Sequence, residues 1–306
     1  MAAPTVSVVI PTYKHREYVA QAVSSALEQA GVSLEVIVVN DGSPDNTVQV
    51  LEPFTQSGRI RYIEQANAGQ AAARNRGISA ATGEFVALLD DDDLWPADRL
   101  AWQVERLAAD PAAVMVFGDF EKFGDVTTHR GPTAAPGVRT FDDFARGCLL
   151  VSPGQASFRR SSLIRVGMLD TDLKGTDDWD LYLRLARQGK ILYENRLALR
   201  YRVHSSNASR HFWQMYINVR KVVDKNLPVR TSDATLRSAA MAFAREYGSY
   251  MGIQRVIVLR RERRFIPMLA ALARTIWIRP ALLNPTAVWR RARYVLKRSA
   301  PMEVHS

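Results

Sequence analysis

Four consecutive carboxylates, Asp90–Asp93, stand between apolar residues in the segment LLDDDDLW. Like charges this close repel one another, so folding alone gives no reason to keep all four. Oxygen ligands suit a hard divalent cation such as Mg²⁺ or Mn²⁺, which takes one or two carboxylates and completes its shell with phosphate oxygens. The alternative is that Asp92 or Asp93 caps a helix that begins near Pro96, which accounts for one or two of the four. The run favours a site for a metal ion and a diphosphate.

Three further segments carry polar side chains whose chemistry depends on where they lie. NDGSPDNT, residues 40–47, is either a turn that faces a ligand or an ordinary turn rich in turn-forming residues. GTDD, residues 175–178, places carboxylates where a helix begins, so they are either functional groups or helix caps favoured by the dipole. His204 follows YRV, and a lone histidine is commonly structural or solvated. None of these segments assigns a function by itself.

Strand and helix patterns alternate through the first part of the chain. Apolar runs predict strands at 6–10, 34–40, 60–65, 84–90 and 114–120, and helical spacing predicts helices at 16–30, from Asp45, at 69–82 and at 96–110. This alternation implies an α/β fold with an open, mostly parallel sheet and helices on both faces. Ligands of such sheets lie at the carboxyl ends of the strands, where Asp41, Asp90 and Asp92 fall.

The second part of the chain is less regular. Residues 124–140 are rich in Gly, Pro and Thr and predict a loop or a β excursion. A helix is expected to begin near Asp178, and a short strand to end at His204. After about residue 210 the pattern is helical and increasingly basic.

Composition and charge limit the class of protein. The chain has 306 residues and 47% apolar residues, enough for one large α/β domain with a smaller appendage. Its single cysteine, Cys148, fits a reducing compartment, and no signal peptide or membrane-spanning helix is expected. Residues 255–300 hold twelve Arg or Lys and one Glu, whereas the rest of the chain is close to neutral. The basicity is therefore a local feature of the C-terminal region.

Six segments in this order make the chain resemble a known family. They are VSVVIPTY, VIVVNDGSPDNT, NAGQAAARNRGI, GEFVALLDDDDLW, GTDDWDLYLRLA and YRVHSSNAS, spread over about residues 5–210. The chain resembles the family-2 glycosyltransferases, inverting enzymes of the GT-A fold that use nucleotide-diphosphate sugars. The resemblance implies a catalytic domain over 1–210, with a nucleotide-binding half at about 1–115 and an acceptor half at about 116–210. A helical, basic region over 211–306 would follow.

The resemblance also implies roles for single residues on the donor side. The donor-binding positions are Pro11, Thr12, Tyr13, Asp41, Arg74, Asp90 and Asp91. Tyr13 would stack on the base, Asp41 would read its edge, and Arg74 would lie in the helix that closes the nucleotide pocket. Asp91 is either a spacer or a secondary contact to the donor.

Further roles concern the metal ion and the acceptor. Asp92 would bind Mg²⁺ or Mn²⁺ on the diphosphate, and His204 resembles a histidine near the metal in some relatives. Asp178 would be the catalytic base that takes a proton from the acceptor hydroxyl. Asp177 stands where the family more often has Glu, and Asp177 and Asp93 would support the site; Asp93 is alternatively a helix cap.

The expected function is metal-dependent, inverting transfer of a sugar, with UDP favoured over dTDP or GDP, to a glycan or a lipid-linked acceptor in cell-surface polysaccharide synthesis. Alternatives are a non-catalytic sugar-nucleotide-binding protein and a nucleotidyltransferase. The latter usually needs a Gly-rich triphosphate loop, which the sequence lacks, and a dinucleotide oxidoreductase is disfavoured for the same missing glycines.

The basic C-terminal region predicts contact with an anionic membrane surface, because it mixes Arg with Trp and aliphatic residues. The alternative is a solvated basic face on an ordinary helical appendage. Nucleic acid is not an expected partner, since the acidic site gives that interpretation no support. A cytoplasmic protein held peripherally on the inner face of the cell membrane is therefore expected.

Overall fold

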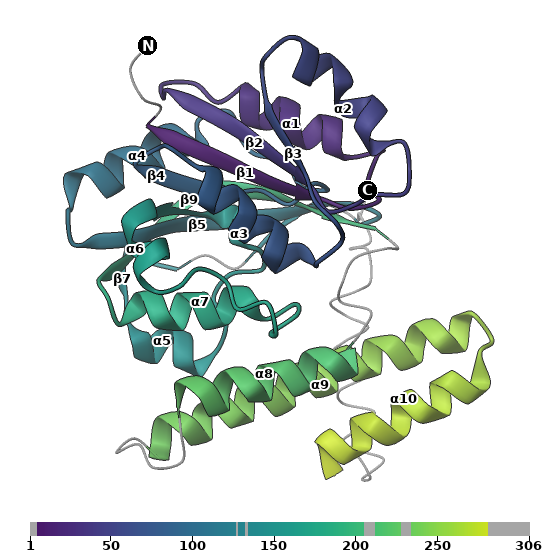
Figure 1. Cartoon of the computed structure of the whole chain (residues 1–306). Coiled ribbons are helices and arrows are strands. Elements are labelled where there is room, and N and C mark those ends of the chain that lie inside the picture. The colour runs from purple at the N-terminus through teal and green to yellow at the C-terminus, as the bar shows by residue number, and fades with distance from the viewer. Residues whose placement is uncertain (1–4, 127, 132–133, 205–211, 228–233, 281–306) are drawn as a thin grey trace, which may run out of the picture. The chain divides into compact units, whose positions relative to one another are not determined.

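The computed structural model describes residues 5–126, 128–131, 134–204, 212–227 and 234–280 (Figure 1). Contacts divide the chain into two compact units. The first comprises the chain up to Phe144 together with Cys148–Val203, and the second comprises Ala145–Gly147 and the chain from His204 onward. The predicted domain limits at 1–210 and 211–306 stay predictions, while the division by contacts falls after Val203.

Strands and helices alternate over the first unit. The strands are β1 (Val6–Thr12), β2 (Leu34–Asn40), β3 (Arg61–Glu64), β4 (Phe85–Leu88), β5 (Ala113–Gly124), β6 (His129–Arg130), β7 (Gly137–Arg139), β8 (Ala156–Arg159) and β9 (Lys190–Val203). The helices up to β9 are α1 (Val19–Leu27), α2 (Thr47–Gln56), α3 (Gln70–Ala80), α4 (Arg99–Ala109), α5 (Phe141–Arg146), the 3₁₀ turn η1 (Pro153–Gln155), α6 (Arg160–Arg165) and α7 (Asp177–Ala186).

The described strands form one sheet in the order β3-β2-β1-β4-β8-β5-β9-β7, with β6 paired to β5. Strands β3, β2, β1 and β4 are parallel to one another, and β5 is parallel to β9. Strand β8 runs antiparallel between β4 and β5 and joins the two parallel groups. The predicted α/β fold class is confirmed, and the excursion predicted at 124–140 contains β6 and β7.

Strand β1 is buried on both sides because helices cover both faces of the sheet. Val8 and Ile10 share a core with Val19 and Ala22 of α1. Side chains alternate between the faces of a strand, so Val9 points to the opposite face. There it meets Gly77 of α3: a Cβ on Gly77 would lie 2.2 Å from Val9 Cγ1. Helix α3 therefore approaches the sheet closely only because Gly77 has no side chain.

We expect Gly77→Ala to destabilise the protein by about 1–3 kcal/mol, because the added methyl group overlaps Val9 and forces the helix away from the sheet. Chemical denaturation measures the free energy of unfolding of both proteins. Ser79→Ala, at an exposed position of the same helix, is the control and should change that free energy by less than about 0.5 kcal/mol. A Gly77→Ala protein as stable as the wild type would contradict the close approach.

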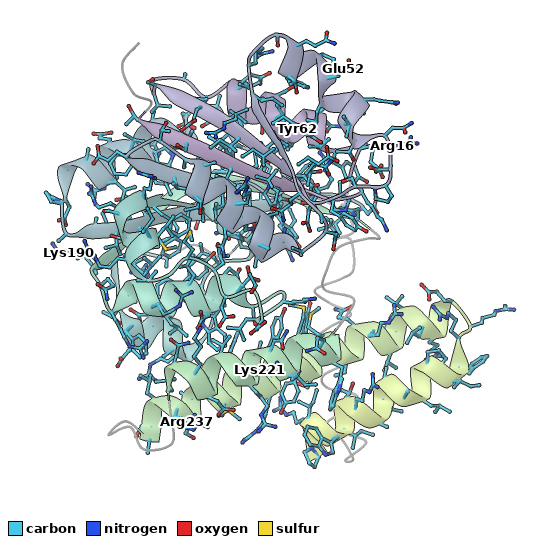
Figure 2. The ribbon with its side chains drawn as sticks, viewed as in Figure 1. Arg16, Glu52, Tyr62, Lys190, Lys221 and Arg237 are labelled. Carbon is cyan, nitrogen blue, oxygen red and sulfur yellow. The ribbon has the colours of Figure 1, made fainter. Side chains whose placement is uncertain are left out.

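In the part of the second unit that the structure describes, the helices are α8 (Phe212–Asn226), α9 (Ala234–Arg261) and α10 (Phe265–Ile278). Helix α9 packs against both α8 and α10 (Figure 1). Arg237 on α9, labelled in Figure 2, donates from Nη2 to Asp224 Oδ1 on α8 at 2.5 Å. Among the helices that the structure describes, none is both long enough and apolar enough to cross a bilayer.

Candidate active site

The candidate site lies at the carboxyl ends of β1, β2 and β4, which are adjacent and parallel. Backbone pairing continues beyond the strands: Asp41 N donates to Thr12 O at 2.9 Å, and Leu89 N donates to Val9 O at 3.0 Å. The loop after β1, with Pro11 and Thr12 buried, therefore shares one sheet edge with Asp41 and with the acidic turn at 90–93.

Asp41 organises the loop that precedes α3. Its carboxylate is 3% exposed and accepts the N–H groups of Ala68 at 2.9 Å and Gly69 at 2.8 Å. The side chain of Gln65 donates to the same carboxylate at 2.8 Å. These donors hold the loop against the end of β2. The contact to a base edge stays a prediction, and such a contact would use an oxygen that already accepts protein N–H groups.

Asp91 ties the acidic turn to the loop after β1. Its Oδ2 accepts the Tyr13 N–H at 3.2 Å, and its Oδ1 lies 2.8 Å from His15 Nδ1. The hydrogen bond to Asp91 raises the pKa of His15 from 6.5 to about 9, against the opposing effect of burial. His15 is therefore a cation at neutral pH. It was not among the residues predicted from the sequence, although a histidine two residues after Tyr13, opposite an acidic run, is a usable signal.

Arg74 joins the acidic turn to the start of α7. This residue is 3% exposed; it donates from Nη2 to Asp90 Oδ1 at 2.5 Å and from Nη1 to Asp177 Oδ2 at 3.2 Å. Burial alone would lower the pKa of Arg74, but the charges of Asp90 and Asp177 outweigh it and raise that pKa. Arg74 is thus a permanent cation between two acids that are far apart in sequence.

Two more side chains hold Asp90, and neither was predicted from the sequence. Gln70 Nε2 donates to Asp90 Oδ1 at 3.0 Å, and Ser152 Oγ donates to Asp90 Oδ2 at 3.1 Å. Ser152 also accepts the Gly154 N–H at 3.0 Å and forms a capping box with Gln155. The S-x-x-Q pattern of that box is visible in the sequence, but its position beside Asp90 depends on β8.

Asp178 is a half-buried carboxylate in the first turn of α7. Its Oδ1 accepts the Trp179 N–H at 2.7 Å, and Trp179 Nε1 in turn donates to Phe144 O at 2.8 Å. Burial, followed by the negative charge of Asp177, raises the pKa of Asp178 from 3.8 to about 7. A carboxylate with this pKa takes up and releases a proton near neutral pH, as a general base does.

The structure does not place Asp93 at the cap of the helix that follows, and its supporting role in the site stays a prediction. Helix α4 begins at Arg99 with Asp98 as its N-cap, so Asp93 does not cap it. Instead Asp93 is fully buried, and its Oδ1 accepts the Arg202 N–H of β9 at 2.8 Å. Burial and the neighbouring acids raise the pKa of Asp93 well above its ordinary value. Asp93 supports the acidic turn by fastening it to β9.

The acidic turn fits a divalent cation that draws most of its ligands from elsewhere. Asp90 and Asp91 contact Arg74 and His15, Asp93 accepts the Arg202 N–H, and Asp92 is half-buried; the binding of a metal ion by Asp92 stays a prediction. Within the residues described, no group of three or more His, Cys, Asp or Glu side chains is arranged to hold a metal ion. One or two carboxylates suffice when phosphates complete the shell.

The predicted metal role of His204 stays a prediction. His204 directly follows β9, whose Arg202 donates from Nε to the Asp92 backbone oxygen at 2.7 Å. Contacts group His204 with the second unit rather than with the sheet. The elements that carry the other candidate residues all belong to the first unit.

The chain is similar in sequence to several glycosyltransferases. The sequence profile described as "Glycosyl transferase family 2" matches residues 7–167. An uncharacterized glycosyltransferase of Nostoc sp. is 34% identical over 217 residues, which cover 66% of each chain. The chondroitin synthase of Pasteurella multocida is 29% identical over 67% of this chain but only 21% of its own length. Curated relatives from Rickettsia match over 31–66% of their own lengths.

The fold is similar to that of solved nucleotide-sugar transferases. The structure of S. aureus TarS in complex with UDP-GlcNAc has a TM-score of 0.67 at 17% identity, covering 90% of this chain and 81% of that one. The mannosyltransferase PcManGT of Pyrobaculum calidifontis, in complex with GDP-Man and Mn²⁺, has a TM-score of 0.61 at 22% identity, covering 98% and 86%. These likenesses confirm the predicted GT-A fold. With the profile covering more than half of the residues, the chain belongs to glycosyltransferase family 2.

Proposed function

We propose that this protein transfers a sugar, with inversion, from a nucleotide-diphosphate sugar to a hydroxyl group of a glycan or a lipid-linked acceptor. The observation that carries the proposal is Asp178, a half-buried carboxylate whose pKa is about 7 and which stands next to the Asp177–Arg74–Asp90 chain of ion pairs. UDP is the favoured nucleotide, as in the TarS complexes, although PcManGT was solved with GDP-Man.

On the acceptor side, Asp178 accepts the proton of the attacking hydroxyl. The Trp179 N–H holds one of its oxygens and so orients the carboxylate, while burial keeps the proton affinity high enough for the transfer. Asp177 forms an ion pair with Arg74, and its negative charge raises the pKa of Asp178 while that of Arg74 lowers it. The residues of this side therefore serve to position and tune a single proton acceptor.

On the donor side, the chain binds and orients the nucleotide. Asp91 fixes the loop that carries Tyr13, which is 38% exposed, has Lys14 Nζ 4.8 Å from the centre of its ring, and would stack on a base. His15 adds a positive charge beside the acidic turn, where a diphosphate is expected. When bound, Mg²⁺ or Mn²⁺ neutralises the charge that develops on the leaving diphosphate, and Asp92 is the residue that would hold it.

A thermal-shift screen against UDP-, dTDP- and GDP-sugars, each with and without Mn²⁺ or Mg²⁺, tests the donor half of this proposal. A ligand at about 100 times its dissociation constant adds about 2.7 kcal/mol of stability, which is a readily measured shift in Tm. We expect a metal-dependent shift with one nucleotide class. Asp92→Ala should remove the metal dependence, and a wild-type protein that no nucleotide sugar stabilises would overturn the proposal.

We expect His15→Ala to raise the KM for the donor by about tenfold or more, because a charge-assisted hydrogen bond at the loop is lost. The effect on kcat should be smaller, since the base Asp178 is untouched. Arg16→Ala, at the exposed neighbouring position, is the matched control for loss of positive charge. Steady-state kinetics at varied donor concentration measure both, and equal KM values for His15→Ala and wild type would contradict the role of His15.

A further inference from the structure

Large apolar side chains are exposed along one helix of the second unit. Phe265 is 61% exposed, Ile266 83%, Leu269 59%, Leu272 37% and Trp277 61%, and all five lie on α10. A helix of 14 residues in water normally keeps such side chains on its buried face. An apolar surface of this kind marks a binding site for another apolar surface.

The exposed residues form one face of α10. At about 100° per residue, Phe265, Leu269 and Leu272 fall along one line, with Ile266 and Trp277 beside it. The opposite side packs on α9 and holds the buried residues Ala271, Thr275 and Ile278. The helix therefore has two apolar sides, and α9 covers one of them (Figure 1).

Aromatic and basic residues frame the exposed face. The ring of Trp277 lies 5.5 Å from that of Trp213 on α8, and Arg274 lies over the Trp213 ring at 5.4 Å. At the other end of α10, Arg263 and Arg264 are exposed, with Glu262 3.8 Å from Arg264. Trp side chains beside cations are typical of the boundary between lipid and water, where the ring is buried and the charge stays wet.

We propose that this face of α10 docks on an anionic membrane surface, with the helix lying in the plane of the interface. Charge complementarity selects this partner: residues 255–300 carry twelve Arg or Lys and one Glu, which anionic headgroups attract. A second copy of the chain would bring the same positive charge against itself. With 14 residues, α10 is too short to span a bilayer, so the proposal places it on the surface.

Flotation of the full chain with vesicles tests the proposal. We expect binding to phosphatidylcholine vesicles that contain phosphatidylglycerol, weaker binding to phosphatidylcholine alone, and partial release at high salt. Ile266→Glu combined with Leu269→Glu should weaken vesicle binding at least about tenfold, because two aliphatic side chains that would enter the membrane surface are replaced by anions. Ile164→Glu is the matched control: Ile164 is 49% exposed but lies on α6 of the first unit, and binding should be unchanged.

Arg263→Ala combined with Arg264→Ala separates the charge from the apolar face. This variant keeps the apolar face and should lose part of the preference for phosphatidylglycerol, because two of the twelve basic residues are removed. No binding of wild-type protein at low salt would overturn the proposal. A double Glu variant that binds vesicles as well as wild type would also overturn it. The same holds if the double Glu substitution lowers the Tm, which would mean that another part of the chain covers this face. It also holds if wild type is a dimer in sedimentation and the double Glu variant is a monomer, which would mean that a second copy covers the face.

Discussion

Asp178→Asn should lower the rate of sugar transfer by about 10²–10⁴-fold while donor binding stays close to that of wild type. Asn has the shape of Asp and can still accept the Trp179 N–H through its side-chain oxygen, but it cannot take up the proton of an acceptor hydroxyl. The donor loops depend on Asp41 and Asp91, which the substitution does not touch. Steady-state kinetics give the rate, and thermal shift with the nucleotide sugar gives donor binding.

The same substitution should stabilise the fold above neutral pH. Burial raises the pKa of Asp178 from 3.8 to about 7, so the folded state holds a proton that the unfolded chain has lost between those values. A raised acid pKa gives stability that is present below the unfolded pKa and is lost as pH rises through the folded pKa. Asn carries no such penalty. The Tm of Asp178→Asn should exceed that of wild type by a few degrees at about pH 8 and match it at about pH 4.

A control substitution at another aspartate and the pH dependence of the rate test whether Asp178 is the base. Asp172→Asn, at an exposed position before α7, should change neither the rate nor the Tm difference between the two pH values. For wild type, kcat/KM should rise with pH through a midpoint near 7, since the base must be ionised to act. An Asp178→Asn enzyme with wild-type turnover would refute the assignment of the base, whatever its Tm.

Much of the fold follows from patterns within single segments. The strands at β1, β2 and β4 are continuous apolar runs, and the alternation of strand and helix dictates a parallel arrangement with ligands at one edge. Strand β8 and turn η1 were not predicted, because four and three residues are too few for a periodic signal. Missing η1 and β8 affects the site, because η1 directly follows Ser152, which donates to Asp90, and β8 follows η1.

The candidate site is predicted less completely than the fold, because the residues that contact its acidic side chains lie far from them in the sequence. The sequence allows Asp91 to be either a spacer or a donor contact, and in the structure Asp91 contacts Tyr13 and His15 of the loop after β1. Asp93 was left open between a cap and a support, and its hydrogen bond to Arg202 joins residues 109 positions apart. No local pattern encodes either pairing.

Arg74→Ala should give the second large effect, a loss of stability of about 3–5 kcal/mol, because two largely buried acids lose the cation that pairs them. The substitution should also change the pKa of the catalytic base. The positive charge of Arg74 lowers the pKa of Asp178 against the effects of burial and Asp177. Without that charge the pKa rises further, so the midpoint of the pH profile of kcat/KM should move to higher pH. A purely structural role would lower stability and leave that midpoint in place.

Arg74→Lys distinguishes charge from geometry. Lysine keeps the positive charge, but its ammonium is a compact group on a flexible chain and lacks the two Nη groups with which the guanidinium bridges Asp90 and Asp177. We therefore expect Arg74→Lys to keep a midpoint close to that of wild type while losing part of the stability, so the pH profile can be measured even if Arg74→Ala does not fold. Arg76→Ala removes an exposed arginine from the same helix and should change neither quantity. If the Lys variant shifted the midpoint to higher pH, the electrostatic coupling between Arg74 and the base would be wrong.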